Sequence, residues 1–133
     1  MNHLSFIDEM VTKLEAAEID KVFVTTTFRG LDSEKKQFGQ VVMITPRDAR
    51  VEEVPGDDDC LIAVTQRVWV SVLTDCPSNM IDGGNLMETA DVFKQCKDAL
   101  KGCSRLQLTG IRVPLIRDKT LIITGEYVNK IHC

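Results

Sequence analysis

The chain has 133 residues, of which 44% are hydrophobic and 27% are charged, and its formal net charge is −4. This length predicts one domain, residues 1–133, large enough to bury a core of its own. The net charge disfavours a protein that grips nucleic acid, because such proteins need clustered Lys and Arg, and no apolar run approaches the roughly 18 residues that span a bilayer.

The N-terminal third predicts one helix and two strands. Residues 4–17 form an amphipathic helix, with apolar residues at the i, i+3, i+4, i+7 spacing and no basic segment of a signal peptide before them. Lys21–Phe28 is rich in β-branched and aromatic residues, as strands are. After a polar connection, Arg29–Gly39, a second strand covers Gln40–Thr45 and is expected to end at Pro46.

The segment Pro46–Asp59 has the weakest pattern in the chain, with two prolines and six acids. We expect a binding loop or a mobile loop here. The alternative is a ribbon through Ala49–Val54.

Cys60–Thr74 is the strongest strand signal. One face carries Ile62, Val64, Val68, Val70 and Val72, and the other face is mixed. After the turn-rich Asp75–Gly84, we expect a second helix to open at Asn85, with Glu88 completing an N-cap pair. Its apolar stripe consists of Val92, Phe93, Cys96, Ala99, Leu100 and Cys103. Gly102 is predicted to end the helix in a left-handed conformation.

Two strands complete the chain. Gly110 and Pro114 predict that Arg105–Leu115 is bent or bulged. A turn at Ile116–Lys119 then leads into Leu121–Ile131 as an antiparallel hairpin. The predicted fold class is therefore α+β: an antiparallel β-sheet with two α-helices packed on one face, in the order α-β-β-(β)-β-α-β-β.

A search for chemistry finds no catalytic residue, no metal site and no cofactor site, so we expect the chain not to be an enzyme. His3 and His132 stand at opposite ends, and Asp57–Asp59 lacks the spaced ligands of a calcium loop. Gly83-Gly84 precedes a helix without the spacing of a phosphate-binding loop. The five cysteines are odd in number and contain no C-x-x-C, so reduced thiols are expected.

Trp69 and Arg67 alternate on the mixed face of the long strand, and both residue types are enriched at interface hot spots. Two interpretations of Trp69 stay open: it anchors an interface, or it fills the core against a helix. The predicted loops carry further cations, which serve either an interface or ordinary solubility: Arg29, Lys35, Lys36, Arg47 and Arg50.

The runs RVWVSVLTD, ETADVFKQCKDALKG and RLQLTGIRVPLIRDKTLIITGEYV resemble the tail-terminator (tail-completion) family of long-tailed bacteriophages. The likeness rests on a strand with an aromatic residue, a helix ending in the pair Ala99-Leu100, a hairpin turn at Arg117-Asp118, and Tyr127 in the last strand. It covers nearly the whole chain. It implies a ring, typically of six copies, that sits on the tail tube, stops tube polymerisation and presents a surface to the head-tail connector protein.

The resemblance also implies a location in the virion tail after synthesis in the host cytoplasm, with no membrane contact. Loops 29–39 and 46–59 would reach a neighbouring copy or the tube, so the interface candidates are Arg29, Lys35, Lys36, Arg47, Arg50, Arg67 and Trp69. DNA would pass through the ring without specific binding, repelled by lumen-facing acids chosen from Glu52, Glu53, Asp57, Asp58 and Asp59. The alternatives are another small head-tail connector or tail component, a small α+β ligand-binding protein or enzyme, or a host regulatory protein that binds another protein.

Overall fold

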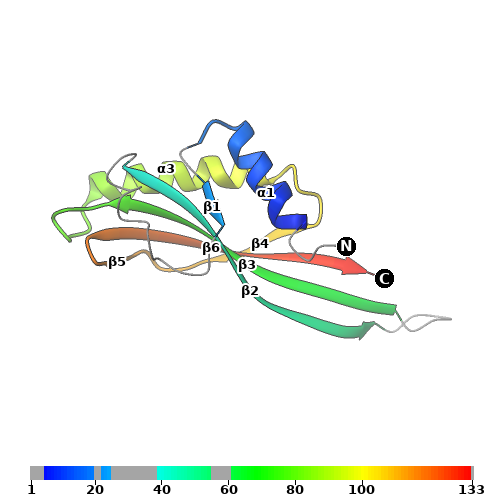
Figure 1. Ribbon diagram of the computed structural model, residues 1–133. Helices are drawn as coiled ribbons and strands as arrows, with labels where there is room; N and C mark the ends of the chain where they lie inside the picture. Colours follow the sequence, from blue (N-terminus) through cyan, green and yellow to red (C-terminus); the bar gives the residue numbers. More distant parts are fainter. Residues whose placement is uncertain (1–4, 20–21, 25–38, 55–60, 133) are drawn as a thin grey trace.

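A computed structural model of the chain describes residues 5–19, 22–24, 39–54 and 61–132. Within these ranges it contains two α-helices and six β-strands (Figure 1). Their bounds are α1 Ser5–Ala16, β1 Val22–Val24, β2 Gln40–Val54, β3 Leu61–Asp75, α3 Gly83–Leu100, β4 Leu106–Ile111, β5 Leu115–Arg117 and β6 Thr120–His132.

The strands form one sheet in the order β1-β2-β3-β6-β4, and β5 pairs with the same edge of β6 as β4 does. All pairings are antiparallel except the one between β1 and β2, which covers three residue pairs. Both helices lie on one face of the sheet (Figure 1). The predicted fold class, α+β with an antiparallel sheet and two helices on one face, is confirmed.

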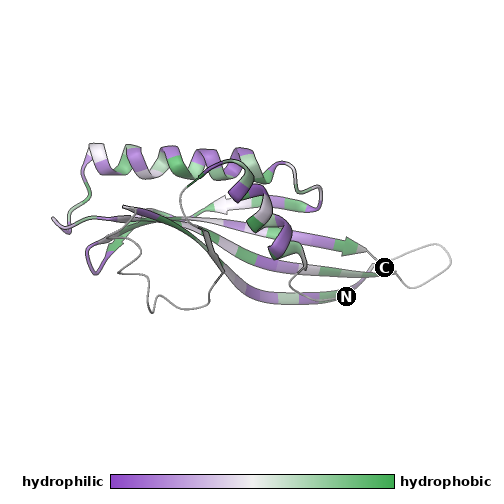
Figure 2. Ribbon diagram, turned by 45° about the horizontal axis from the view of Figure 1, so that its top comes forward, coloured by the Kyte–Doolittle hydropathy of each residue, from purple (hydrophilic) through white to green (hydrophobic). Residues whose placement is uncertain are grey.

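The main core lies between the helices and the sheet. Every second residue of a strand points to the helix side, and most of these residues are apolar. Figure 2 shows this alternation of hydrophilic and hydrophobic residues along the strands. The predicted stripes of both helices are confirmed in the buried cluster, which includes Ile7, Met10, Leu14, Val92, Phe93, Cys96, Leu100 and Cys103. Against them pack Val42, Ile44, Val68, Val70, Val72, Ile123 and Tyr127 from the strands.

The prediction that a strand ends at Pro46 is wrong. The loop predicted for Pro46–Asp59 is wrong as far as Val54. β2 continues through Pro46, and the register shifts directly after it: Pro46 pairs with Val68 and Ala49 with Gln66. Two residues of β2 therefore oppose Arg67 alone, which is a β-bulge. A proline without an N–H is tolerated beside a bulge and on an edge strand, and no other described strand pairs with β2 beyond Ile44.

The predicted start of the second helix is also wrong, and so is the left-handed conformation predicted for Gly102 at its end. α3 begins at Gly83, and the N-cap is Asp82, whose carboxylate accepts a hydrogen bond from the backbone N–H of Asn85 at 2.8 Å. Asn85 Oδ1 accepts the N–H of Asp82 in return, at 3.0 Å, so Asn85 is the third residue of the helix and completes a capping box. At the other end Lys101 caps the helix in a right-handed conformation, and Gly102 has no positive φ.

The predicted strand at Arg105–Leu115 is bent, as expected. A bulge separates Leu108 from Gly110, and the segment splits into β4 and β5. The turn that follows is shorter than predicted, because Ile116 and Arg117 still belong to β5 and only Asp118 and Lys119 connect it to β6. Their φ angles of 50° and 59° are those of a type I′ hairpin turn.

The C-terminal end of β2 and the N-terminal end of β3 project beyond both helices (Figure 1). We call residues 49–54 and 61–66 the arm; they pair in unbroken register from Ala49–Gln66 to Val54–Leu61. On the helix side of the arm Val51 is 69% exposed and Ile62 is 40% exposed. The arm thus carries apolar side chains that the described part of the chain leaves uncovered.

Candidate functional site

The sheet face opposite the helices, which we call the outer face, carries a cluster of charged and aromatic residues. Odd-numbered residues of β3 point to this face, since Val68, Val70 and Val72 point to the helices. Trp69 stands near its centre, paired with Thr45 of β2 on one side and Glu126 of β6 on the other. Trp69 therefore does not fill the core against a helix, and its role in an interface stays a prediction.

Two arginines contact the Trp69 ring from opposite sides of β3. The Arg47 Cζ atom lies 4.1 Å from the ring centroid and the Arg112 Cζ atom lies 4.8 Å from it. Arg47 comes from the bulge of β2, and Arg112 follows the last residue of β4. Guanidinium groups at this distance interact favourably with the ring, by about 0.5–1 kcal/mol each at exposed sites.

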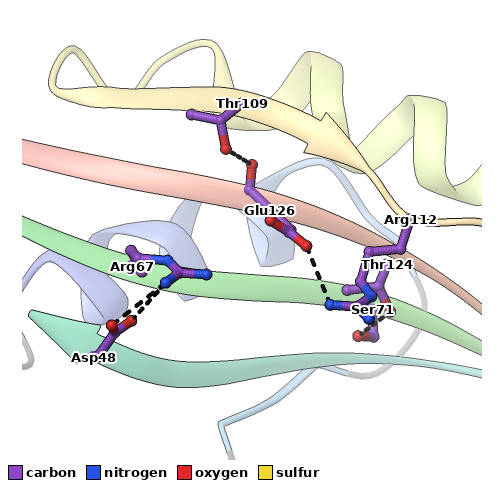
Figure 3. Close-up of polar contacts among 7 residues, drawn as sticks. All are labelled: Asp48, Arg67, Ser71, Thr109, Arg112, Thr124 and Glu126. Carbon is purple, nitrogen blue, oxygen red and sulfur yellow. Dashed lines mark hydrogen bonds and ion pairs between the residues drawn. The ribbon is translucent and has the colours of Figure 1, made fainter.

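The cluster contains two ion pairs, which Figure 3 shows. Arg67 Nη1 lies 3.3 Å from Asp48 Oδ1, and Arg112 Nη1 lies 3.3 Å from Glu126 Oε1. Both pairs are partly exposed and each is worth at most about 1 kcal/mol. Arg47 has no carboxylate within 4 Å in the part of the chain that the structure describes, so the cluster has three cations and two acids.

Next to the stack the outer face becomes uncharged. Ser71 and Thr124 share a hydrogen bond of 2.9 Å between their hydroxyls (Figure 3). Beyond them lies a small buried apolar cluster of Val41, Met43, Leu73 and Ile122. The indole N–H of Trp69 is buried, with no hydrogen-bond acceptor in the described ranges.

Two open hollows are each lined by one of the arginines that contact Trp69. One, of about 410 Å³, is lined by Pro46, Arg47, Asp48 and Arg67. The other, of about 680 Å³, is lined by Gly110–Leu115 and Glu126. Three apolar side chains by the second hollow are strongly exposed: Ile111 (56%), Val113 (84%) and Leu115 (46%). The site is a broad surface that suits a protein segment better than a small molecule.

The structure brings together three of the predicted interface residues, Arg47, Arg67 and Trp69. Arg50 lies apart from them on the arm, 4.0 Å from Glu52 on the same face. The remaining basic candidates, Arg29, Lys35 and Lys36, fall outside the described residues.

The acidic candidates divide in a similar way. Glu52 and Glu53 are exposed on opposite faces of the arm, whereas Asp57, Asp58 and Asp59 fall outside the described residues. Their orientation toward a lumen stays a prediction. Sequence reasoning missed Asp48, Arg112 and Glu126, which join the site only through the register of the sheet.

The described ranges contain no group of three or more His, Cys, Asp or Glu side chains placed to hold a metal ion. Among the described helices, none has the length and apolar character needed to cross a membrane. Cys76, Cys96 and Cys103 are buried, and within the described ranges Cys76 and Cys103 form no disulfide.

Among the described residues, two ionisable groups with perturbed pKa values, Cys103 and Tyr127, lie in the main core, away from the outer face. Burial raises the pKa of Tyr127 to about 12, and the neighbouring Cys96 and Cys103 add to the shift. Burial, followed by the carboxylate of Glu9, raises the pKa of the Cys103 thiol. Both groups stay neutral at pH 7 and belong to the packing.

No protein-family model matches the chain, and no curated protein matches it.

Proposed function

We propose that the chain is a tail terminator of a long-tailed bacteriophage, a ring-forming virion protein that caps the tail tube and offers a joining surface to the head. The order of elements and the runs quoted above support this proposal. A ring needs two different patches on each copy, because every subunit contacts its neighbours head to tail.

The observation that carries the proposal is a pair of unlike apolar patches on opposite edges of the sheet. One is the group of Ile111, Val113 and Leu115 on the side of β4 and β5. The other is on the arm of β2 and β3, where Val51 and Ile62 are exposed. Exposed apolar groups of this kind are typical of contact surfaces, and two on opposite edges suit a heterologous contact.

A third exposed group supports contact with another protein. Met80, Ile81 and Met87 lie at the start of α3 and are 68%, 43% and 65% exposed. Methionine side chains adapt to irregular partner surfaces. We assign this group to the tail tube or the connector.

The test is electron microscopy of phage tails assembled with and without the chain. Tails of uncontrolled length in its absence, and of one length with it, support termination. Val113→Asp places a charge in an edge patch and should prevent control of length, whereas Lys94→Glu on the exposed side of α3 is the matched control and should not. Tails of normal length without the chain would instead favour another head-tail component.

A second measurement addresses the enzyme or ligand-binding class. Sedimentation of the purified chain should show a ring-sized particle, alone or after mixing with tail tubes. A strict monomer under both conditions, combined with a thermal shift on adding a small molecule, would overturn the proposal.

A further inference from the structure

The charge of this chain is concentrated in one short segment. Residues 50–59 contain one arginine and five acids, a net charge of −4, which equals the net charge of all 133 residues. The rest of the molecule is therefore neutral as a whole. The described acids of this segment, Glu52 and Glu53, are exposed at the end of the arm.

The outer-face cluster has the opposite character. Its three arginines face two acids, and Arg47 has no carboxylate partner in the described ranges. Trp69 lies between Arg47 and Arg112 and leaves its indole N–H without an acceptor there. Guanidinium groups held against an aromatic ring form a pre-ordered receptor for carboxylates, because the ring fixes their positions.

The arm cannot reach this cluster within one copy. Glu52 pairs with Ala63, and Trp69 lies six residues further along β3. At about 3.3 Å per residue the separation is about 20 Å. The continuous β2–β3 and β3–β6 ladders hold the arm extended, and charges that far apart are screened at physiological salt.

We propose that the acidic segment 50–59, which begins on the arm, binds the Arg47–Trp69–Arg112 surface of a second copy. This inference rests on the proposed ring, because it needs copies that associate head to tail, and it names the charged contact between them. Carboxylates of the arm pair with Arg47 and Arg112, and the arm lies across the two hollows that these arginines line. This inference places the acids of residues 50–59 in a contact between subunits and not on the lumen of the ring.

The contact can be measured without a ring, because Trp69 is the only tryptophan in the chain and reports from inside the site. The receptor is the full chain with the arm acids neutralised (Glu52→Gln, Glu53→Gln, Asp57→Asn, Asp58→Asn and Asp59→Asn), so that no neighbour's arm occupies the surface. The probe is a synthetic peptide of residues 50–59, which contains no tryptophan. We expect a saturable change in Trp69 fluorescence that weakens as salt is raised.

The controls assign the signal to the named groups. Adding Arg47→Gln and Arg112→Gln to the receptor should lower the peptide affinity about tenfold, as expected for two exposed contacts of this type. Adding Lys94→Gln on α3 instead should leave it unchanged, and a peptide with Gln and Asn in place of its acids should not bind. Absence of a saturable change, or equal affinity for the arginine variant, overturns the inference.

A charge exchange tests the contact between whole copies. Arg47→Glu with Arg112→Glu makes one variant, and Glu52→Lys and Glu53→Lys combined with Asp57→Asn, Asp58→Asn and Asp59→Asn make the other, whose residues 50–59 carry a net charge of +3. Each should repel its own kind, whereas an equal mixture should associate in sedimentation, since each arm then meets a receptor of opposite charge.

The outcomes separate this inference from the proposed function. Peptide binding to the arginine surface while tails keep normal length without the chain would support the contact and contradict termination. Control of tail length without peptide binding would do the reverse.

Discussion

Gly125 of β6 lies against the Phe93 ring of α3, and it offers a sharp test of the packing. A Cβ atom at this position would lie 2.6 Å from Cζ and 2.9 Å from Cε2 of Phe93, and 3.2 Å from Cδ1 of Leu108. The φ angle of Gly125 is not in the left-handed region, so the constraint is the contact with Phe93. That ring is 6% exposed and belongs to the main core.

The cost of Gly125→Ala follows from these distances. Carbon atoms in contact prefer a separation of about 3.5–4.0 Å, so the Phe93 ring must retreat by about 1 Å into packed neighbours. Overpacking of this kind costs about 1–3 kcal/mol, and replacing a strand glycine by alanine returns about 0.5–1 kcal/mol of backbone entropy. We expect a net loss of about 1–2 kcal/mol in the free energy of unfolding, measured by urea denaturation followed by Trp69 fluorescence.

A double-mutant cycle separates the clash from other effects. Phe93→Leu removes the ring atoms nearest to the new Cβ and destabilises the chain by itself, because it leaves a cavity. On that background Gly125→Ala should cost little or become stabilising, giving a coupling energy of about 1–2 kcal/mol. Equal costs on both backgrounds, or an alanine variant as stable as the parent chain, would show that α3 does not press on the sheet here.

Three further predictions concern local structure. Lys119→Gly should stabilise the β5–β6 hairpin by about 0.5–1 kcal/mol, because Lys119 has a φ of 59°; a loss of stability in urea denaturation would contradict this. Asp82→Ala should lower the free energy of unfolding by about 1 kcal/mol in the same assay, because the α3 N-cap is lost. Asp82→Asn should retain most of the stability that the cap contributes. Tyr127 ionises near pH 10 when unfolded and near 12 when folded, so its contribution to stability is full below pH 10 and is lost as pH rises toward 12. Tyr127→Phe should be at least as stable as the parent chain at pH 7, because the buried hydroxyl has no partner in the described ranges. Between pH 10 and 12 the stability of the variant should fall less than that of the parent chain. An identical fall in both chains would refute the assignment.

The fold class could be predicted because the spacing of apolar residues is unambiguous in a helix or strand that buries one face. The alternation in Cys60–Thr74 and the stripes of two helices each indicate one buried side. Three surfaces of this kind can be covered together only if both helices pack on the same face of the sheet. The buried cluster shared by α1, α3 and the central strands has this arrangement.

The ends of elements could not be predicted as well, because they depend on contacts remote in sequence. Pro46 ends a central strand but is tolerated on an edge, and the sequence does not say which strand lies at the edge. Asp82 and Asn85 are both good N-caps, and only the pairing of their side chains selects Asp82. The close approach of Phe93 to Gly125 leaves no sequence signal except a glycine inside a strand.

The candidate site was predictable only in part for the same reason. Strand alternation places Arg67 and Trp69 on one face, and this was predicted correctly. Arg47 and Arg112 reach Trp69 from two segments that are 65 positions apart, and both depend on irregularities of the sheet, the β2 bulge and the end of β4. The alternation of residues predicts the direction of a side chain only in a regular strand. It does not predict the contacts of residues at a bulge or at the end of a strand.

The bulge after Pro46 links the two surfaces that the proposals use. In a regular strand Asp48 would point to the helix side, away from Arg67; because Arg47 and Asp48 oppose Arg67 together, Asp48 can form its ion pair there. The extra residue also reverses the alternation of everything that follows, so Val51 shares the helix side of the arm with Ile62, while Arg50 and Glu52 turn to the outer face. One inserted residue therefore sets both the arginine surface around Trp69 and the apolar side of the arm. The arginine surface and the arm, which we propose to meet in a contact between copies, thus depend on the same irregularity of β2.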